Sequence, residues 1–590
     1  MAHSEQEILL GQPVSPGIAL GSVFLLQKQR DPVVETHIDK NNQEAELARF
    51  DEAIYKTRVE LRQHRRKATR TLGNVVARIF DAHLLILDDE PTFDMVRDLI
   101  TQENLSPEYS LWKIFEEIAE KFDLFEDDLW RDRAQDVRDV CDRLLAHLSG
   151  KRSESILDLK EPSILVAPEL QPSDVLQLDQ EKVLGIATDT GGSTSHTAIL
   201  TRSLGVPSVV GLMDITERLN ENDQIVINGN SGKVILRPTP EETIVYAEKE
   251  KQYQNFMDSL CDIREKDAVT RDGHRIDVAA NIELPDEARR VILKGGNGVG
   301  LYRTEYLVLT QGGLPSEELQ AEEYIKVAKS LDGKPLIIRT FDLGGDKAFP
   351  GSGIPSQINP FLGYRAIRVG LDRPEMLIPQ LRAILRASAF GPLRVMFPMI
   401  SHLEELFEAK KLLEQAKNEL IAEDIPFDKN IPVGIMVEVP AVAILANHFA
   451  PHVDFFSIGT NDLVQFCLAV DRGNEQVAEL HQPFHPAVLR LIKETVDAGH
   501  KNGIWVGLCG EFAGNPLATL LLLGLGLDEL SASPALIPEI KKLVISSTYK
   551  DAKALADKAL SLTTAKEVRQ LLLEAMKKRF KDMPIWFGGQ

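Results

Sequence analysis

The sequence predicts a multidomain α/β protein: a small α/β domain with an inserted helical bundle, followed by a C-terminal (β/α)8 barrel. Three observations support this organisation. Apolar residues recur at helical spacing within residues 31–149, short strands and turns fill residues 150–240, and strands alternate with helices about eight times beyond residue 263. The 590 residues leave room for roughly three to four domains.

The composition excludes several classes of protein. A formal net charge of −22 argues against binding nucleic acid through a broad basic surface. The four cysteines contain no CxxC pair, which argues against a disulfide framework or a zinc ribbon, and we expect Cys141, Cys261 and Cys467 to be inert core thiols. Residues 1–5 are polar and no run of ~18 apolar residues occurs, so we expect a cytoplasmic protein without membrane insertion.

The first α/β domain is expected to comprise residues 1–30 and 150–240. Its strand-like segments are residues 164–166, 183–187 and 208–210, together with a hairpin formed by 223–229 and 233–237. The alternation of small and apolar residues in 14–26 predicts a further strand in the same domain. Residues 31–149 are therefore predicted to be an insertion.

The insertion is expected to be all helical. Two apolar stripes recur at spacings of three and four, namely Leu72, Val75, Val76, Ile79, Phe80, His83 and Leu87, and then Leu111, Ile114, Phe115, Ile118, Phe122 and Phe125. A charged connecting helix over residues 241–262 follows the α/β domain.

Residues 263–590 are predicted to form the barrel, with an open doubly wound sheet as the alternative. The expected strands are residues 276–281, 298–301, 335–339, 393–397, 433–437, 453–458, 504–508 and 529–532. In a barrel of this kind the reactive side chains lie at the carboxyl ends of the strands, so candidate site residues should be found there.

The loop at residues 191–197, GGSTSHT, carries the first candidate. Two glycines allow the backbone to approach a bulky anion, and the amides at the start of the following helix attract phosphate. The His196 imidazole is a competent nucleophile near neutral pH. The pattern therefore predicts a histidine that accepts a phosphoryl group, with an incidental histidine beside an N-cap as the alternative.

The other candidates end or follow barrel strands. They are Arg303, Arg339, Arg365, Glu438, Asn461, Asp462, Arg472 and Cys509. Glu438 and Asp462 suit Mg²⁺, the arginines suit phosphate and carboxylate oxygens, and the Cys509 thiol can deliver a proton to carbon. A small substrate that carries carboxylate and phosphate and becomes an enolate when phosphate leaves fits this set, and phosphoenolpyruvate meets these conditions. Taken singly, each arginine could be a surface ion pair, Cys509 an inert core thiol, and either carboxylate a helix cap.

Several motifs in this order resemble the phosphoenolpyruvate-protein phosphotransferase family, Enzyme I of the bacterial sugar phosphotransferase system. They are residues 11–17, 191–197, 301–305, 344–347, 359–365, 454–462, 471–474 and 509–511, and the resemblance covers nearly the whole chain. Ser193 departs from the pattern, because many members of the family carry a basic residue there.

The resemblance implies that His196 is the phosphoryl acceptor and that Cys509 protonates the enolate. It implies that Arg303, Arg339 and Arg472 contact phosphoenolpyruvate, assisted by Asn461, and that Glu438 and Asp462 hold Mg²⁺. We also expect Arg365 and Asp462 to contact the substrate. The family works as a dimer joined through the barrel.

The family passes the phosphoryl group to a small histidine phosphocarrier protein, of the sugar or the nitrogen branch. The resemblance places that carrier on residues 31–149, where His83 and the acidic run 88–90 are candidates and His83 is also a candidate core residue. We expect the phosphohistidine domain to swivel about connections near 145–155 and 238–262. The rival functions are a dikinase or synthase that charges its histidine from ATP, and a non-catalytic phosphohistidine regulator.

Overall fold

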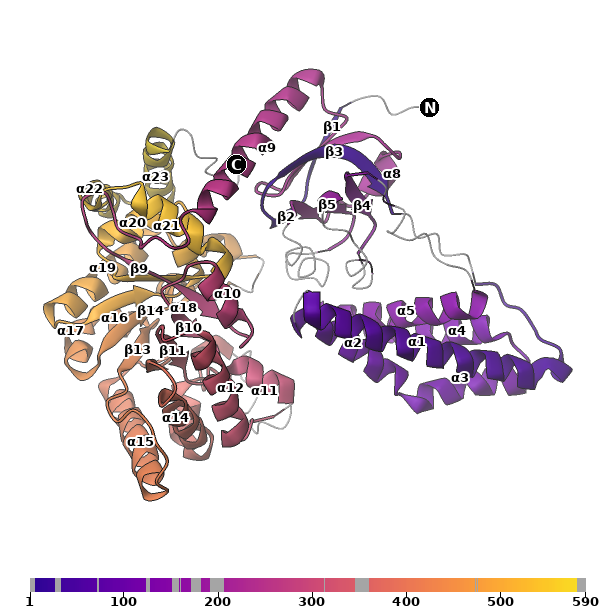
Figure 1. The fold of residues 1–590 in the computed structure, drawn as a ribbon, viewed down its shortest axis with the longest axis horizontal. Coiled ribbons are helices and arrows are strands. Elements are labelled where there is room, and N and C mark those ends of the chain that lie inside the picture. Colours follow the sequence, from indigo (N-terminus) through magenta and orange to yellow (C-terminus); the bar gives the residue numbers. More distant parts are fainter. Residues whose placement is uncertain are drawn as a thin grey trace. The chain divides into compact units, whose positions relative to one another are not determined.

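The computed structural model describes residues 6–26, 33–71, 74–123, 128–150, 159, 161–170, 174, 182–191, 206–311, 313–344, 360–472, 474 and 476–580. Residues 1–254 fall in one compact unit and residues 255–587 in the other. Figure 1 shows the helices and strands of each part.

Five helices form a bundle in the first unit: α1 (Gln43–Thr71), α2 (Asn74–Leu87), α3 (Glu90–Gln102), α4 (Pro107–Asp123) and α5 (Asp128–Ser149). Their apolar stripes meet in a core that contains Phe50, Leu61, Phe80, Phe93 and Phe115. The stripe residues with described side chains, such as Phe80, Leu87 and Leu111, therefore face the bundle interior, as the periodicity predicts. Leu72 and Phe125 lie outside the described residues.

An eight-stranded sheet with the order β1-β8-β7-β3-β4-β5-β6-β2 forms the α/β part of the first unit. Its strands are β1 (Glu7–Leu10), β2 (Gln12–Ser15), β3 (Ile18–Leu25), β4 (Ser163–Ala167), β5 (Val183–Thr188), β6 (Ser208–Val210), β7 (Gln224–Asn228) and β8 (Lys233–Leu236), and the short helix α8 spans Ile215–Arg218. Strand β3 pairs in parallel with β4, so the chain leaves the sheet after β3 and returns to it after the bundle. The bundle is thus inserted between two neighbouring strands.

The second unit contains a closed barrel of eight parallel strands. They are β9 (Asp277–Ile282), β10 (Val299–Tyr302), β11 (Leu336–Arg339), β12 (Leu393–Phe397), β13 (Val433–Val437), β14 (Phe455–Ile458), β15 (Trp505–Leu508) and β16 (Glu529–Ala532). Pairing of β16 with β9 closes the ring, which rules out the open doubly wound sheet. The predicted fold class, including the barrel, is confirmed.

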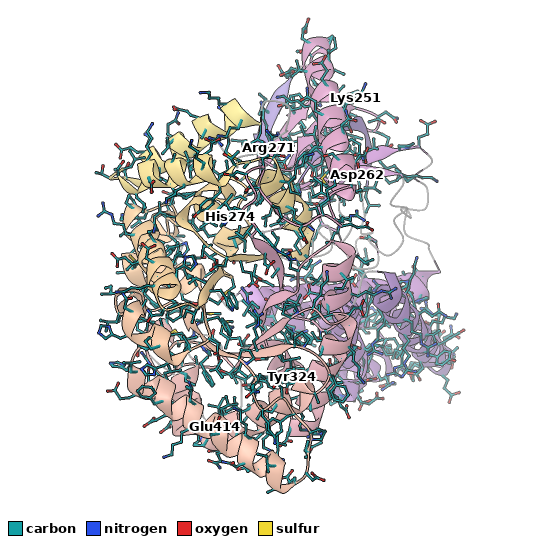
Figure 2. The ribbon with its side chains drawn as sticks, turned by 60° about the vertical axis from the view of Figure 1, so that its left-hand side comes forward. Lys251, Asp262, Arg271, His274, Tyr324 and Glu414 are labelled. Carbon is teal, nitrogen blue, oxygen red and sulfur yellow. The ribbon has the colours of Figure 1, made fainter. Side chains whose placement is uncertain are left out.

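Helices surround the barrel strands (Figure 1). The helix α9 (Pro240–Cys261) precedes the barrel, and those that follow are α10 (Glu287–Leu293), α11 (Glu305–Gln311), α12 (Glu317–Ser330), α13 (Ile367–Asp372), α14 (Pro374–Ser388), α15 (Leu403–Ala422), α16 (Pro440–Ile444), α17 (Ala446–Phe449), α18 (Thr460–Leu468), α19 (Pro486–Lys501), α20 (Thr519–Leu525), α21 (Ile537–Ile545), α22 (Tyr549–Leu560) and α23 (Ala565–Arg579). Figure 2 labels Tyr324 on α12 and Glu414 on α15.

Local sequence explains where several of these helices begin. The Ser316 side chain accepts a hydrogen bond from the Leu319 amide at the start of α12. Thr564 and Glu567 form a reciprocal capping box at the start of α23. Both arrangements satisfy amides that have no partner within the helix. Among the helices of the described residues, none is long and apolar enough to cross a membrane.

Candidate active site

A cavity of about 420 Å³ opens at the carboxyl ends of the barrel strands. Its walls are formed by Glu283, Leu301, Arg303, Glu305, Tyr306, Arg339, Leu343, Met436, Glu438, Gly459, Asn461, Asp462, Arg472, Cys509, Gly510 and Glu511. Active sites of (β/α)8 barrels lie at this face. The cavity is therefore the strongest candidate for the site among the described residues.

Seven of the residues predicted from strand ends line this one cavity: Arg303, Arg339, Glu438, Asn461, Asp462, Arg472 and Cys509. Arg365 is not among the lining residues. His196 lies within residues 192–205, outside the described residues. Apart from Arg365, the candidates in the barrel therefore all line the same cavity.

The Arg339 guanidinium is buried at the end of β11. Its Nη2 donates to Glu305 Oε1 at 2.9 Å, and its Nη1 lies 3.4 Å from Asp342 Oδ2. Its Nε is buried without a hydrogen-bond partner among the described residues. Arg339 also lines the cavity, and a guanidinium is a suitable donor to an anion there.

Arg365 is 1% exposed, and its guanidinium forms ion pairs with two aspartates. Its Nε and Nη2 donate to the two carboxylate oxygens of Asp342 at 2.7 and 2.8 Å. Its Nη1 also lies 3.3 Å from Asp462 Oδ1. Arg365 therefore contacts Asp462, one of the two predicted metal ligands, and its direct contact with the substrate stays a prediction.

The surroundings of Glu438, one of the two predicted metal ligands, disfavour its charged form. Burial, and then the charges of Asp462 and Asp342, raise the pKa of the Glu438 carboxyl to about 8. Glu438 Oε1 accepts a hydrogen bond from the Met399 amide at 2.6 Å, which fixes the side chain. A Cβ on Gly459 would lie 3.1 Å from Glu438 Oε2, so this glycine allows the carboxylate to sit close to the backbone.

This donor set fits Mg²⁺. The cavity wall carries five carboxylates, from Glu283, Glu305, Glu438, Asp462 and Glu511, against three guanidinium groups. Within the described ranges, no group of three or more His, Cys, Asp or Glu side chains is arranged to hold a metal. Mg²⁺ is bound by one or two protein carboxylates together with water and substrate phosphate, so Glu438 and Asp462 suffice.

The Cys509 thiol is buried at the end of β15 yet lines the cavity. Burial raises its pKa to about 11, so it is protonated at neutral pH. Its Sγ donates to the Ile458 carbonyl oxygen at 3.7 Å. The Asn281 amide of β9 donates to the Cys509 carbonyl oxygen at 2.8 Å, which fixes the backbone of this residue.

Asn461 is held by reciprocal hydrogen bonds with Glu511. Its Nδ2 donates to Glu511 Oε1 at 3.2 Å, and its Oδ1 accepts from the Glu511 amide at 3.0 Å. The His481 imidazole contacts the Asn461 carbonyl oxygen at 3.1 Å. Close by, the Arg472 amide donates to Gln465 Oε1 at 3.1 Å.

Sequence reasoning missed the carboxylates that partner the arginines. Glu283 Oε1 accepts from Arg303 Nη1 at 2.6 Å, and Glu305 accepts from Arg339. Glu283 directly follows β9 and Glu305 lies three residues beyond β10. Applying the strand-end rule to every strand would have found both.

Outside the barrel, Asp189 anchors the chain at the end of β5. Its two carboxylate oxygens accept hydrogen bonds from the amide and the hydroxyl of Thr216. In the bundle His83 is buried, with Nε2 3.1 Å from Asp136 Oδ1, as expected of a core histidine. Residues 88–90 are exposed.

The remaining cysteines differ in exposure. Cys141 is buried and Cys467 is half-buried. The expectation of a core thiol is wrong for Cys261, which is exposed. It occupies the last position of α9, where the helix ends.

Comparison with known proteins gives a consistent result. Family models described as the PEP-binding, N-terminal and mobile domains of PEP-utilising enzymes match residues 258–549, 10–133 and 159–232. The chain is 43% identical to a phosphoenolpyruvate-protein phosphotransferase of Haemophilus influenzae, over 96% of this chain and 99% of that protein. It is 42% identical to the protein of the same name from Staphylococcus carnosus, with the same coverage of both chains. A solution NMR structure of an Enzyme I protein aligns with 42% of this chain and 99% of its own, at 35% identity and a TM-score of 0.37.

Proposed function

The chain belongs to the phosphoenolpyruvate-protein phosphotransferase family, and we propose that it transfers the phosphoryl group of phosphoenolpyruvate to its own His196 and then to a histidine phosphocarrier protein. The observation that supports this best is that three arginines, the Glu438 and Asp462 carboxyl groups and one protonated thiol line a single cavity. Pyruvate is the second product.

Phosphoenolpyruvate binds in the barrel cavity under this proposal. Arg303, Arg339 and Arg472 donate to its phosphate and carboxylate oxygens, and Asn461 assists. Arg365 holds the Asp462 carboxylate in place through its own ion pair. Glu438 and Asp462 hold Mg²⁺, which stabilises the charge on the phosphoryl oxygens when bound.

The chemical step is an in-line displacement at phosphorus. A neutral His196 nitrogen forms the new N–P bond while the bond from phosphorus to the enol oxygen breaks, so the electron pair leaves with the enolate of pyruvate. Cys509 then gives its proton to the methylene carbon, and the resulting thiolate regains a proton from solvent. The raised pKa of Cys509 suits this task because the thiol holds its proton until a carbanion accepts it.

The proposed function also implies two protein partners, a phosphocarrier and a second copy of this chain. We propose that the small phosphocarrier docks on the helical bundle, where residues 88–90 present exposed acidic side chains. We propose further that two copies associate through the barrel domain and that the enzyme works in the cytoplasm. The family resemblance supports each of these.

Label transfer tests the proposed function. The full-length chain, incubated with Mg²⁺ and phosphoenolpyruvate labelled at phosphorus, should become labelled at His196 and release pyruvate, and His196→Ala should abolish the label. Labelling of His196→Ala at the wild-type rate would refute the assignment. Charging from ATP in place of phosphoenolpyruvate would instead favour the dikinase or synthase, and the absence of pyruvate release with either donor would favour the regulator.

A further inference from the structure

An acidic side chain faces one of the cavity arginines at the cavity wall. Glu283 directly follows β9 and Arg303 directly follows β10, and these two strands are parallel neighbours in the barrel. Glu283 Oε1 accepts a hydrogen bond from Arg303 Nη1 at 2.6 Å, and both residues line the cavity. An anion that binds at Arg303 therefore meets a carboxylate at the same guanidinium.

The Glu283–Arg303 pair differs from the pair that holds Arg339. Glu305 is nearly buried, and its Oε1 also accepts from the Asp342 amide at 2.8 Å, so that carboxylate is fixed in the wall. The Glu283 side chain is 57% exposed, and Arg303 is its hydrogen-bond partner among the described residues. The Glu305 side chain is thus held in a fixed position, whereas the exposed Glu283 side chain can move away from Arg303 when an anion takes its place.

The backbone that carries Glu283 is itself held in place. The amides of Glu283 and Leu284 both donate to Glu287 Oε2, at 2.8 and 3.0 Å. The Arg303 amide donates to the Ile282 carbonyl oxygen at 3.0 Å. Because both backbones are anchored, the two side chains meet at a defined distance, and only the side chains need to rearrange.

We propose that Glu283 is a built-in competitor for Arg303 that sets the affinity and the charge selectivity of the cavity. When no substrate is bound, its carboxylate occupies the Arg303 guanidinium. When an anion binds, Glu283 is displaced, and its negative charge opposes the ligand in proportion to the ligand's own charge. The inference rests on the proposed function, since it takes phosphoenolpyruvate as the ligand.

Because the repulsion by Glu283 grows with the charge of the ligand, Glu283 should weaken the binding of highly charged anions most. Phosphoenolpyruvate carries at least two negative charges at neutral pH and pyruvate carries one. Removing the charge of Glu283 should therefore tighten the binding of phosphoenolpyruvate more than that of pyruvate. We expect a gain of roughly threefold to tenfold for phosphoenolpyruvate, the range for charges that interact near a solvated surface.

Calorimetric titration of the full-length chain in the presence of Mg²⁺ measures the effect directly, with His196→Ala introduced into the wild type and into every variant so that bound phosphoenolpyruvate is not turned over. The variants are Glu283→Gln, which keeps the shape of the side chain, and Glu283→Ala, which removes it. The matched control is Asp286→Asn, which removes one negative charge from the same loop but from a residue that pairs with Lys326 instead of Arg303. Each protein is titrated with phosphoenolpyruvate and with pyruvate, at low and at high salt.

We expect both Glu283 variants to bind phosphoenolpyruvate more tightly than the wild type does. The gain in affinity for pyruvate should be smaller, and both gains should shrink at high salt. The proposal is overturned by unchanged or weaker binding, by an equal gain for both ligands, or by the same gain in Asp286→Asn. In those cases the proposed function stands as long as the wild type binds phosphoenolpyruvate. If the wild-type chain binds none, the proposed function fails and this inference fails with it.

Discussion

Asn281 holds Cys509 through a hydrogen bond of 2.8 Å from its side-chain amide to the Cys509 carbonyl oxygen. Asn281 lies on β9 and Cys509 follows β15, so the contact joins two strands that are not neighbours in the barrel order. The Ser531 hydroxyl on β16, the strand between them, donates to Asn281 Oδ1 at 2.7 Å. The position of the proposed proton donor therefore depends on a polar chain inside the barrel.

Replacing Asn281 by Ala should impair the step that Cys509 performs. The substitution removes the donor to the Cys509 carbonyl oxygen, and an unpaired buried carbonyl lowers the free energy of unfolding by about 1–3 kcal/mol. It also removes the contact that holds the Cys509 backbone, and with it the thiol, in place. We expect pyruvate formation to slow by about tenfold, which corresponds to ~1.4 kcal/mol of barrier. Exchange of phosphate between the phosphorylated protein and its carrier should be unaffected, because that half-reaction does not use the barrel.

The control for this prediction is Ser531→Ala, which removes the contact to Asn281 and leaves the bond from Asn281 to Cys509 in place. Its effect on pyruvate formation should be smaller. Equal damage to pyruvate formation and to carrier exchange in Asn281→Ala would show that the residue supports the fold in general.

Alkylation should distinguish Cys509 from Cys261. Burial raises the pKa of Cys509 to about 11, so below that pH the group remains a thiol, and the reactive thiolate fraction rises only as the pH approaches it. Cys261 is exposed. We expect iodoacetamide at pH 8 to modify Cys261 quickly and Cys509 slowly, as measured by mass spectrometry of peptides.

The pH dependence provides the internal control for that experiment. Modification of Cys509 should accelerate as the pH rises from 8 towards 10.5, while the chain remains folded by circular dichroism. Rapid alkylation of Cys509 at pH 8 would contradict a thiol that holds its proton at neutral pH.

Binding of Mg²⁺ should release a proton. Burial and the charges of Asp462 and Asp342 raise the pKa of Glu438, so in the absence of metal this carboxyl is mainly protonated at pH 7. A metal ligand must be deprotonated, and the affinity for Mg²⁺ should therefore increase as the pH rises from 6 to 8. Titration in buffers of different ionisation enthalpy should show the release of roughly one proton per ion bound near pH 7.

The comparison variant for the magnesium experiment is Glu438→Gln, which cannot release this proton. It should bind Mg²⁺ weakly and show no dependence of the measured heat on the buffer. If wild-type affinity is constant between pH 6 and 8, the raised pKa of Glu438 is not coupled to the metal.

The barrel was predictable because its strands are short apolar runs buried on both faces, and such runs alternate visibly with helical stretches. Predicted and observed boundaries differ by at most two residues, as in 298–301 against β10 (Val299–Tyr302), and those of β12, β13 and β16 coincide. Residues at the strand ends followed from topology alone, because parallel strands in a barrel end at one face. Closure of the sheet could not be read from the sequence, since it depends on the pairing of β16 with β9.

The pairing of side chains was much harder to predict. Arg365 and Arg303 look alike in sequence, yet Arg365 is buried against Asp342 and Asp462 while Arg303 stays partly exposed beside Glu283. The difference lies in the acidic side chains that each guanidinium meets in the folded chain. Apolar periodicity carries no information about those partners.

Gln380 provides the last prediction, because it connects the wall of the site to the helices behind it. It is completely buried on α14. Its Oε1 accepts from the Phe341 amide at 2.9 Å, and its Nε2 donates to the Thr304 hydroxyl and to the Tyr324 hydroxyl at 3.2 Å each. Thr304 in turn donates to the Arg339 carbonyl oxygen at 3.0 Å. One side chain thus fixes the backbone on both sides of Thr340.

Replacing Gln380 by Leu should destabilise the barrel and loosen Arg339. The change leaves the Phe341 amide without this acceptor and removes the hydrogen bonds to Thr304 and Tyr324. We expect the free energy of unfolding to fall by about 2–4 kcal/mol. Calorimetry should show a lower temperature for the unfolding transition of the barrel, and the KM for phosphoenolpyruvate should rise. Gln415→Leu on α15 is the matched control, because Gln415 is exposed and bonds Glu419 at 2.9 Å, so its effect should stay within about 0.5 kcal/mol. A Gln380→Leu protein with the wild-type transition temperature and KM would show that the buried network does not position Arg339.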